Sequence, residues 1–431
     1  MKRLFVLVGL SLMFARPSWG QDTVRVKGVY DAAVRPGIVV LPTAASLDSV
    51  RAIIARDLDY SDRFEVIVLP AQGPVAAATP GPINYALYRS LRAALAVEVG
   101  GTAGAVTIKL HDLSAEFIRQ EATVPLDPSG TGEARMGVHR AADDIVRWVF
   151  DRPGVAATRI LFLNNGDKRV YRIDSDGHGQ TPMSPSNVLA MSPAWSPDGS
   201  RIAYTQLGGE GPGAVILQSV ATGTRIVVPT TNVSQNITPS LSPDGRKLIF
   251  SRLTEQAANL YSVNVADLCC AERLTAGRFA ENLSPVYSPD GRRVAFVSNR
   301  SGSPQIYAMA ADGTDQELLV PFDYGSSGNS FAPDWSADGT TLVFHRESGG
   351  SPQLVSFDVG ARQLRQRTGP GGRNEDPSFA PDGRHVVFVS NRTGRGQLHV
   401  LDFETGRVRQ IMTPGVARLP AWSRPLGRGR Q

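Results

Sequence analysis

A four-residue turn, Ser-Pro-Asp-Gly or a near variant of it, recurs along the chain and constrains the fold more than any other feature. Its aspartates are 46, 46, 48 and 44 residues apart: they are Asp198, Asp244, Asp290, Asp338 and Asp382. A period in the forties, with several short apolar runs in each unit, is typical of a β-propeller. In such a turn proline presets φ, aspartate bonds its own backbone and glycine adopts a positive φ, so the turn joins two antiparallel strands.

One repeat unit, residues 284–320, illustrates the predicted blade. SPVYS, RRVAFVS, QIYAMA and QELLV read as four short strands separated by turns and a loop. The first strand of each unit ends on a large apolar residue, which we expect to fill the gap between neighbouring blades. These residues are Trp195, Leu241, Tyr287, Trp335, Phe379 and Trp422.

The two ends of the repeat region complete each other. Residues 159–185 supply a second, a third and a weaker fourth strand without a first, and residues 418–423 supply a first strand alone. Five full units and one split unit predict six blades, with blade 1 closed by residues 418–423. Closure would pair the sheet edges that an open ring leaves exposed. The predicted propeller spans 159–424, and a tail follows at 425–431.

Residues 21–152 show a different pattern, which predicts a small α+β domain. Strands are expected at 24–30, 37–42, 64–70 and 105–126, and helices at 46–62 with Ser46 as N-cap, from 83 onward and at 133–150. The fold class expected for the chain is therefore an α+β N-terminal domain followed by a six-bladed all-β propeller.

The first twenty residues have the pattern of a secretory signal peptide. Lys2 and Arg3 precede an eleven-residue apolar run, Leu4 to Phe14, which is too short to span a bilayer, and small residues follow up to Gly20. We expect cleavage after Gly20; an uncleaved anchor is the alternative. No later run is long enough to insert in a membrane, so the mature chain is expected to be exported and not membrane-inserted.

The charge of the chain argues against nucleic acid as a partner. The formal net charge is +5. It falls to +2 when Lys2, Arg3 and Arg16 leave with the signal peptide (5 − 3 = 2). The dense basic patch that neutralises phosphates is absent from the rest of the sequence.

Signals for catalysis, metal binding or a cofactor are weak. A GxSxG elbow is absent, and the histidines form neither HExxH nor HxH: they are His111, His139, His178, His345, His385 and His399. We therefore expect no catalytic residue, no metal ligand and no cofactor, and these histidines are expected at the surface or in packing positions. Cys269 and Cys270 are adjacent, which leaves two free thiols or a strained vicinal disulfide open.

Two segments carry a resemblance that the repeat alone does not. VRVKGVYDAAVRPGIVVLP (24–42) and GVHRAADDIVRWVFDRPGVAATRILFLNN (137–165), followed by the SPDG units, resemble the TolB family of the Tol–Pal cell-envelope system. The resemblance covers essentially the whole mature chain. It implies a periplasmic adaptor, expected as a monomer, that supports outer-membrane integrity and cell division.

The resemblance implies two partner-binding regions. A Pal-like peptidoglycan-associated lipoprotein would bind the loops at one mouth of the propeller channel, at Gln235, Asn236, Thr238, Glu281, Asn282, Asn329, Ser330, Asn374, Glu375 and Asp376. A TolA-like inner-membrane protein would bind the N-terminal segment of Asp22, Thr23, Val24, Arg25, Val26 and Lys27, where an extended chain can add to a sheet edge.

Two other functions are compatible with a propeller. A propeller-type hydrolase or lactonase would show metal-dependent turnover. A sensor would bind small ligands or wall fragments in the channel, where Glu281, Glu375 and Asp376 could also hold a cation.

Overall fold

The structure is a computed structural model, and it describes residues 35–69, 82–102, 104–126, 132–208, 211–231, 233–277, 279–321, 328–348 and 350–425. The segments predicted as signal peptide (1–20), strand 24–30 and C-terminal tail lie outside these residues, apart from Pro425. No helix in the described part of the chain is both long and apolar enough to cross a bilayer.

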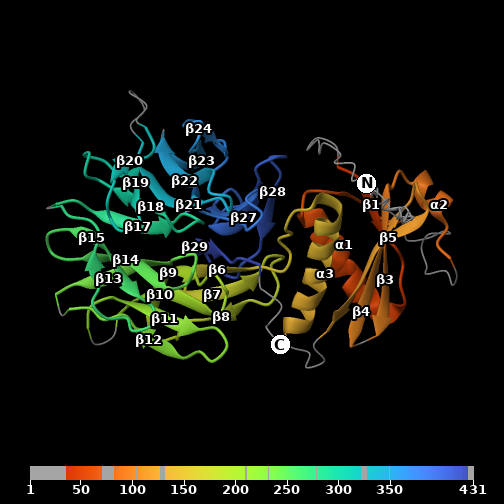
Figure 1. Cartoon of the computed structure of the whole chain (residues 1–431), viewed down its shortest axis with the longest axis horizontal. Helices are drawn as coiled ribbons and strands as arrows, with labels where there is room; N and C mark the ends of the chain where they lie inside the picture. The colour runs from red at the N-terminus through yellow and green to blue at the C-terminus, as the bar shows by residue number, and fades with distance from the viewer. Residues whose placement is uncertain are drawn as a thin grey trace, which may run out of the picture. The chain divides into compact units, whose positions relative to one another are not determined.

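The N-terminal domain is a five-stranded sheet with helices on both faces (Figure 1). Its elements are β1 (Gly37–Val40), η1 (Ala45–Leu47), α1 (Asp48–Tyr60), β2 (Glu65–Ile67), α2 (Tyr85–Ser90), β3 (Leu95–Thr102), β4 (Ala105–Asp112), β5 (Phe117–Pro125) and α3 (Gly132–Phe150). The strand order is β2-β1-β3-β4-β5, with β1 parallel to both neighbours and β3, β4 and β5 antiparallel. The α+β class predicted for this region is confirmed.

Alternation along the strands divides the core of this domain in two. Ile38 and Val97 pack with α1 and α3 on one face, whereas Val39 and Ala96 pack with Tyr88 of α2 on the other. The predicted cap of the first helix is wrong: α1 has Leu47 at its N-cap, and no side chain caps it because the helix is entered through η1.

The rest of the described chain forms six four-stranded sheets (Figure 1). Blade 1 is β29 (Ala417–Trp422), β6 (Arg159–Asn164), β7 (Arg169–Asp174) and β8 (Thr181–Pro182). Blade 2 is β9 (Leu189–Trp195), β10 (Arg201–Leu207), β11 (Ala214–Ser219) and β12 (Arg225–Val227). Blade 3 is β13 (Gln235–Leu241), β14 (Lys247–Leu253), β15 (Ala258–Asn264) and β16 (Glu272–Arg273).

The remaining blades follow the same order. Blade 4 is β17 (Asn282–Tyr287), β18 (Arg293–Ser298), β19 (Gln305–Ala310) and β20 (Glu317–Leu318). Blade 5 is β21 (Ser330–Trp335), β22 (Thr341–Ser348), β23 (Ser351–Asp358) and β24 (Gln363–Gln366). Blade 6 is β25 (Asn374–Phe379), β26 (His385–Ser390), β27 (Gln397–Asp402) and β28 (Val408–Ile411). The six-bladed propeller predicted from the repeat is confirmed.

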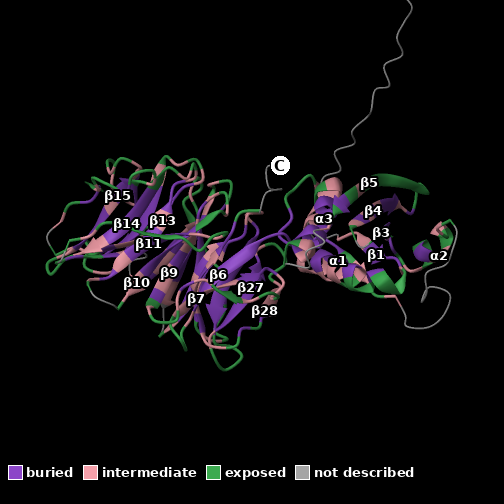
Figure 2. Ribbon diagram, turned by 90° about the horizontal axis from the view of Figure 1, so that it is seen from below, coloured by how far each residue is buried: buried purple, intermediate pink, exposed green. Residues whose placement is uncertain are grey.

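The innermost strands form a closed ring. Each of β9, β13, β17, β21, β25 and β29 contacts the next, and β29 contacts β9. The end strand β29 pairs antiparallel with β6, with Trp422 opposite Ile160. Large residues at the ends of the inner strands are buried between blades, including Tyr287, Trp335 and Trp422. Figure 2 shows that buried residues follow the strands of the propeller, whereas exposed residues lie mostly in the loops.

The repeated turn is held by one hydrogen-bond pattern in blades 2 to 5. In blade 2, Ser196 Oγ donates to Asp198 Oδ1 at 2.6 Å and accepts the backbone N–H of Arg201 at 2.9 Å. Gly199 follows with φ of 70°, a conformation that glycine adopts without steric cost. The same bonds recur around Ser242, Ser288 and Ser336, so the turn chemistry inferred from the sequence is confirmed.

Candidate functional site

Each inner strand carries a bulge that shapes the central channel. A residue with positive φ precedes proline in all six: Ser192, Thr238, Ser284, Ala332, Asp376 and Leu419, with φ between 47° and 52°. Proline cannot donate to the strand ladder, and the register with the second strand shifts at this point. The six bulged residues and their prolines line a cavity of about 310 Å³ on the propeller axis.

Two carboxyl groups line this cavity, those of Asp334 and Asp376. Asp376 Oδ2 accepts the backbone N–H of Leu419 at 3.2 Å, and its own N–H donates to His345 Nδ1 at 3.1 Å. Burial raises the pKa of Asp376, although His345 and the Leu419 N–H oppose that shift. These bonds join blades 5, 6 and 1, so Asp376 contributes to holding the ring as well as lining the channel.

Asp334 clasps the neighbouring blade with its side chain. Its Oδ2 accepts the backbone N–H of Phe379 at 2.7 Å and Ser378 Oγ at 3.0 Å. Burial is the main cause that raises the pKa of Asp334 to about 6, and its hydrogen bonds offset only part of this shift.

Asp334→Asn is expected to remove a pH dependence of stability. Because the folded-state pKa of Asp334 is raised from 3.8 to about 6, its stabilising contribution is complete below 3.8 and is lost as the pH rises through 6. We expect the unfolding free energy of the unmodified protein to lose about 1–2 kcal/mol from this group between pH 4 and 7.5. Urea unfolding at both pH values should show that loss missing from Asp334→Asn; an equal loss in both proteins would contradict the assignment.

The predicted Pal-binding residues fall into two structural groups. Asn236, Asn282, Ser330 and Asn374 are fully buried, with 0% exposure, so they do not line the mouth as the sequence suggested. Gln235, Glu281 and Asn329, which directly precede them, are exposed or half-buried at the starts of the inner strands. Thr238 and Asp376 lie deeper, on the channel wall.

The buried group has a structural role that repeats from blade to blade. Each member accepts a hydrogen bond from an arginine at the end of the second strand, at 2.8–3.2 Å; these are Arg252, Arg300, Arg346 and Arg392. Each guanidinium lies 5.4 or 5.5 Å from a phenylalanine ring of its own strand, within cation–π range. The buried asparagine or serine therefore holds an arginine against the phenylalanine ring of the second strand.

Glu375 is also tied to its surroundings. It is 8% exposed and pairs with Arg373 and Arg418, which links blade 6 to blade 1. Burial alone would raise the pKa of Glu375, but the hydrogen bond from Arg373 and the charge of Arg418 hold it below its usual value.

Exposed apolar side chains gather in the segments around the starts of the inner strands. Leu189, Val233, Phe279 and Met412 are 50%, 79%, 80% and 67% exposed. Val233 and Phe279 are 46 residues apart (279 − 233 = 46), so they occupy the same position in adjacent repeats. Exposed apolar patches rimmed by polar groups often mark protein-binding sites. We call these four residues, together with Gln235 and Glu281, the mouth surface.

Gln235 and Glu281 of this surface were predicted from the sequence, whereas its apolar members were not. The sequence contained a pattern that could have identified them, because Val233 and Phe279 are large apolar residues at loop positions, where turn-forming residues are expected. The predicted TolA-binding residues 22–27 lie outside the described residues. Cys269 and Cys270 are free and exposed, which resolves the alternatives left open for them.

Residues 149–423 match the family model described as the TolB beta propeller domain. The chain belongs to the TolB family. Curated relatives include the Tol-Pal system protein TolB of Methylococcus capsulatus, 30% identical over 212 residues, which are 47% of this chain and 49% of that protein. The TolB of Haemophilus influenzae is 30% identical over 243 residues, 53% of this chain and 56% of that protein. The chain thus matches about half the length of these TolB relatives.

The likeness extends further in three dimensions. The crystal structure of TolB from Acinetobacter baumannii superposes with a TM-score of 0.75 at 24% identity and covers 91% of this chain and 97% of that one. At 24% identity the superposition shows that the two proteins share a fold, but it does not show that they share a function.

Proposed function

We propose that this chain is a non-catalytic, periplasmic adaptor of the Tol–Pal system that binds a Pal-like lipoprotein through the mouth surface. The observation that supports it most directly is that exposed apolar and polar side chains recur in the segments that lead into the inner strands, at the end of the channel where these strands begin. Interfaces derive most of their affinity from a few such residues, aromatic ones above all, within a polar rim. The curated relatives are named as proteins of the Tol-Pal system, so we look for the partner within that system.

The second half of the proposal concerns residues 22–27. Binding of a TolA-like protein by this segment would let the chain connect an inner-membrane complex to a wall-bound lipoprotein, and so support envelope integrity and cell division. The support for binding of a TolA-like protein is the resemblance of residues 22–27 to the TolB family.

Substitution in the mouth surface is expected to weaken lipoprotein binding at least tenfold. Phe279→Asp removes the aromatic side chain of the mouth surface, which is 80% exposed, and Glu281→Lys reverses the charge beside it. Loss of one central contact of this kind costs about 1.4 kcal/mol or more, which is a tenfold change in Kd. The measurement is the affinity of the purified chain for the soluble domain of the Pal-like lipoprotein of the same organism.

Matched substitutions on outer strands serve as controls. Ile226→Asp introduces the same charge at a 51% exposed residue of β12, and Glu272→Lys reverses an exposed charge on β16. Both should bind like the unmodified chain. If the mouth variants also bind normally, or if the unmodified chain shows no affinity, the proposal fails.

A further inference from the structure

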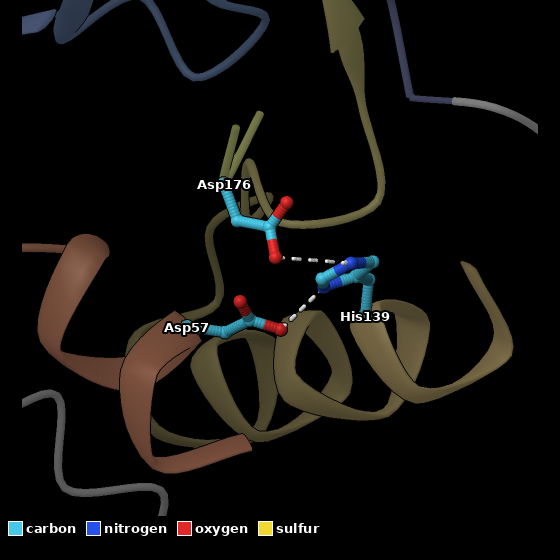
Figure 3. A group of neighbouring side chains, drawn as sticks. All are labelled: Asp57, His139 and Asp176. Carbon is cyan, nitrogen blue, oxygen red and sulfur yellow. Dashed lines mark hydrogen bonds and ion pairs between the residues drawn. The ribbon is translucent and has the colours of Figure 1, made fainter. Parts of the chain in front are cut away.

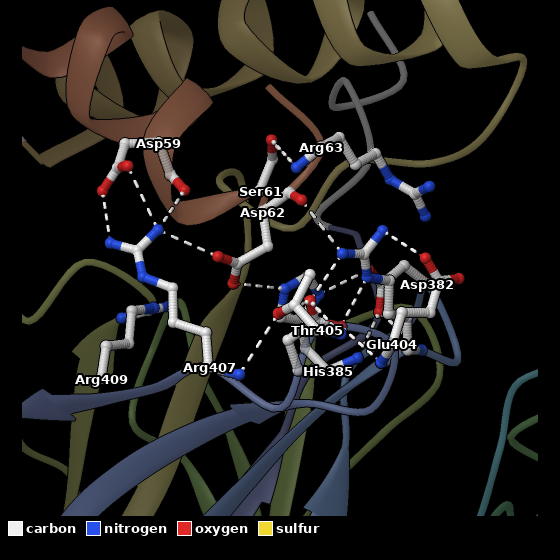
Figure 4. A network of polar contacts seen from close by, with 12 residues as sticks. Asp59, Ser61, Asp62, Arg63, Asp382, His385, Glu404, Thr405, Arg407 and Arg409 are labelled. Carbon is white, nitrogen blue, oxygen red and sulfur yellow. Dashed lines mark hydrogen bonds and ion pairs between the residues drawn. The ribbon is translucent and has the colours of Figure 1, made fainter. Parts of the chain in front are cut away.

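The contacts between the α+β domain and the propeller are made by charged groups. No apolar cluster within the described residues combines side chains of residues 35–150 with those of the propeller. Instead, carboxylates at the end of α1 face arginine and histidine side chains of blade 6 (Figure 4). An interface of this kind depends on the protonation of its members far more than an apolar one does.

The turn of blade 6 departs from the pattern of blades 2 to 5. Ala380 replaces the serine that otherwise bonds the turn aspartate, and His385 occupies the position of Arg201 in blade 2. His385 Nδ1 lies 2.7 Å from Asp382 Oδ2 and so takes over the side-chain bond to the turn aspartate. Its other nitrogen, Nε2, lies 3.2 Å from Asp62 Oδ2 of the α+β domain.

This geometry requires a protonated imidazole. A neutral histidine has one N–H to donate, whereas both nitrogens of His385 face carboxylate oxygens. The Asp402 carboxylate faces His385 as well, and Asp62, His385 and Asp402 are all buried. Burial opposes the charge, but the three carboxylates outweigh it and raise the pKa of His385 to about 9.

Arginines of blade 6 complete this cluster. Arg407 donates to Asp62 Oδ1 at 2.9 Å and to Asp59 Oδ2 at 2.8 Å. Arg384 binds Asp402 at 2.5 and 2.6 Å and donates to the Asp62 carbonyl at 3.0 Å. Because guanidinium groups already bind these carboxylates, the cluster is an ion-pair network, and its acidic groups are not free metal ligands.

A second histidine cluster lies at blade 1. His139 of α3 has Nδ1 2.6 Å from Asp57 Oδ2 and Nε2 3.8 Å from Asp176 Oδ2 of the propeller (Figure 3). Arg56 and Arg135 of the α+β domain also pair with Asp176. Burial lowers the pKa of His139, but its bond to Asp57 and the charges of both aspartates shift it above its usual value, against the opposing charge of Arg135.

We propose that these two histidine clusters form a proton-dependent latch, which holds the α+β domain on the propeller while His385 and His139 are protonated. Loss of the His385 proton leaves a lone pair facing a carboxylate oxygen, so the contact with Asp62 becomes repulsive. Arginine pairs then remain between the domains: those of Arg56 and Arg135 with Asp176, and that of Arg407 with Asp59, which is more than a third exposed and open to screening by salt.

The connecting segment determines how the open state can move. Residues 151–158 link α3 to β6, and Asp143 of α3 accepts the N–H groups of Ala156 and Ala157, both at 2.9 Å. Asp143 pairs with neither histidine, but the charges of Asp57 and His139 reach its buried carboxyl, whose pKa is raised to about 7 mainly by burial. We therefore expect the α+β domain to pivot about the segment when the latch opens.

The test is energy transfer between dyes on the two domains of the full chain. Cysteines replace the exposed Glu121 of β5 and Glu255 of blade 3, in a Cys269→Ser, Cys270→Ser background. Asp382 and Asp402 stay beside His385 in the propeller, so only the bond to Asp62 makes its pKa higher in the docked state than in the undocked state. Docking is therefore strongest while His385 is protonated and weakens as the pH rises through about 9. The efficiency of energy transfer between the two dyes should change between pH 7 and 10. The measurement is made in 1 M NaCl, which screens the exposed Arg407–Asp59 pair.

Variants separate the latch from general destabilisation. His385→Gln should show the high-pH efficiency already at pH 7 and lose the transition, and Asp62→Asn should behave alike. His399→Gln removes a buried propeller histidine that touches no residue of the α+β domain, and it should keep the transition. Circular dichroism checks that each variant is folded. Constant efficiency from pH 6 to 10, or a transition unchanged in His385→Gln, would overturn the proposal.

Discussion

Trp422→Ala is expected to lower the free energy of unfolding by about 3–5 kcal/mol, the range for removal of a buried large aromatic side chain. Trp422 is 7% exposed and packs with residues of blades 1 and 6, among them Ile160 and Val387. Its indole N–H donates to Thr158 Oγ1 at 2.7 Å, and its backbone N–H donates to Ser378 Oγ at 3.1 Å. The substitution therefore weakens the strand that closes the ring.

Guanidinium chloride unfolding followed by far-ultraviolet circular dichroism measures this change. Trp422→Phe keeps an aromatic ring but leaves Thr158 without its donor, so it should lose clearly less than the alanine variant. If Trp422→Ala lost no more than about 1 kcal/mol, typical of surface substitutions, the closing strand would not be essential to the stability of the ring.

Asp402→Ala should be about as damaging, with a loss of roughly 3–5 kcal/mol, because it removes the buried carboxylate that binds Arg384, whose other acidic partner, Glu404, is 39% exposed. Arg384 and Asp402 are 3% and 0% exposed, and Asp402 also binds Thr405 and faces protonated His385. Burial opposes the charge of Asp402, but the hydrogen bonds from Arg384 and Thr405 lower its pKa to about 2. Its contribution is therefore present above pH 3.8 and is lost as the pH falls through 2.

The acid limb of the stability curve distinguishes this pair from a surface ion pair. The unmodified protein should lose more stability between pH 5 and 2.5 than Asp402→Ala does. Glu317→Ala breaks the exposed Arg293–Glu317 pair and should cost less than about 1 kcal/mol at pH 7. If Asp402→Ala and Glu317→Ala lowered the free energy of unfolding equally, the buried Arg384–Asp402 pair would stabilise the protein no more than the exposed pair does.

The blade count and the fold class could be predicted because they depend on short-range chemistry repeated at a fixed interval. Ser196, Asp198 and Gly199 form the turn within six residues of sequence, so the turn can be recognised from the sequence of any single repeat. The inner-strand bulges were not predicted, since positive φ at Thr238 or Asp376 arises from strand pairing and not from the residue itself.

Exposure within the candidate site was the least predictable feature. Asn282 looks like a loop residue in the sequence, and only the position of Arg300 across the blade explains its burial. His385 and Asp62 are 323 residues apart, so no local pattern connects them. A signal did exist: blade 6 breaks the repeat at two positions, Ala380 and His385, where the other blades keep the serine-centred turn.

The order of strands along the chain has a consequence for biogenesis. Strand β29 follows every other propeller strand, yet it pairs with β6, which precedes them all. A polypeptide emerging N-terminus first from a ribosome or a translocon would present the unpaired edge of β6, with Leu161 and Leu163, throughout its elongation. Chaperones that shield nascent β edges would then be needed for longest at this one strand, and premature truncation would yield an incompletely assembled species that is prone to aggregate.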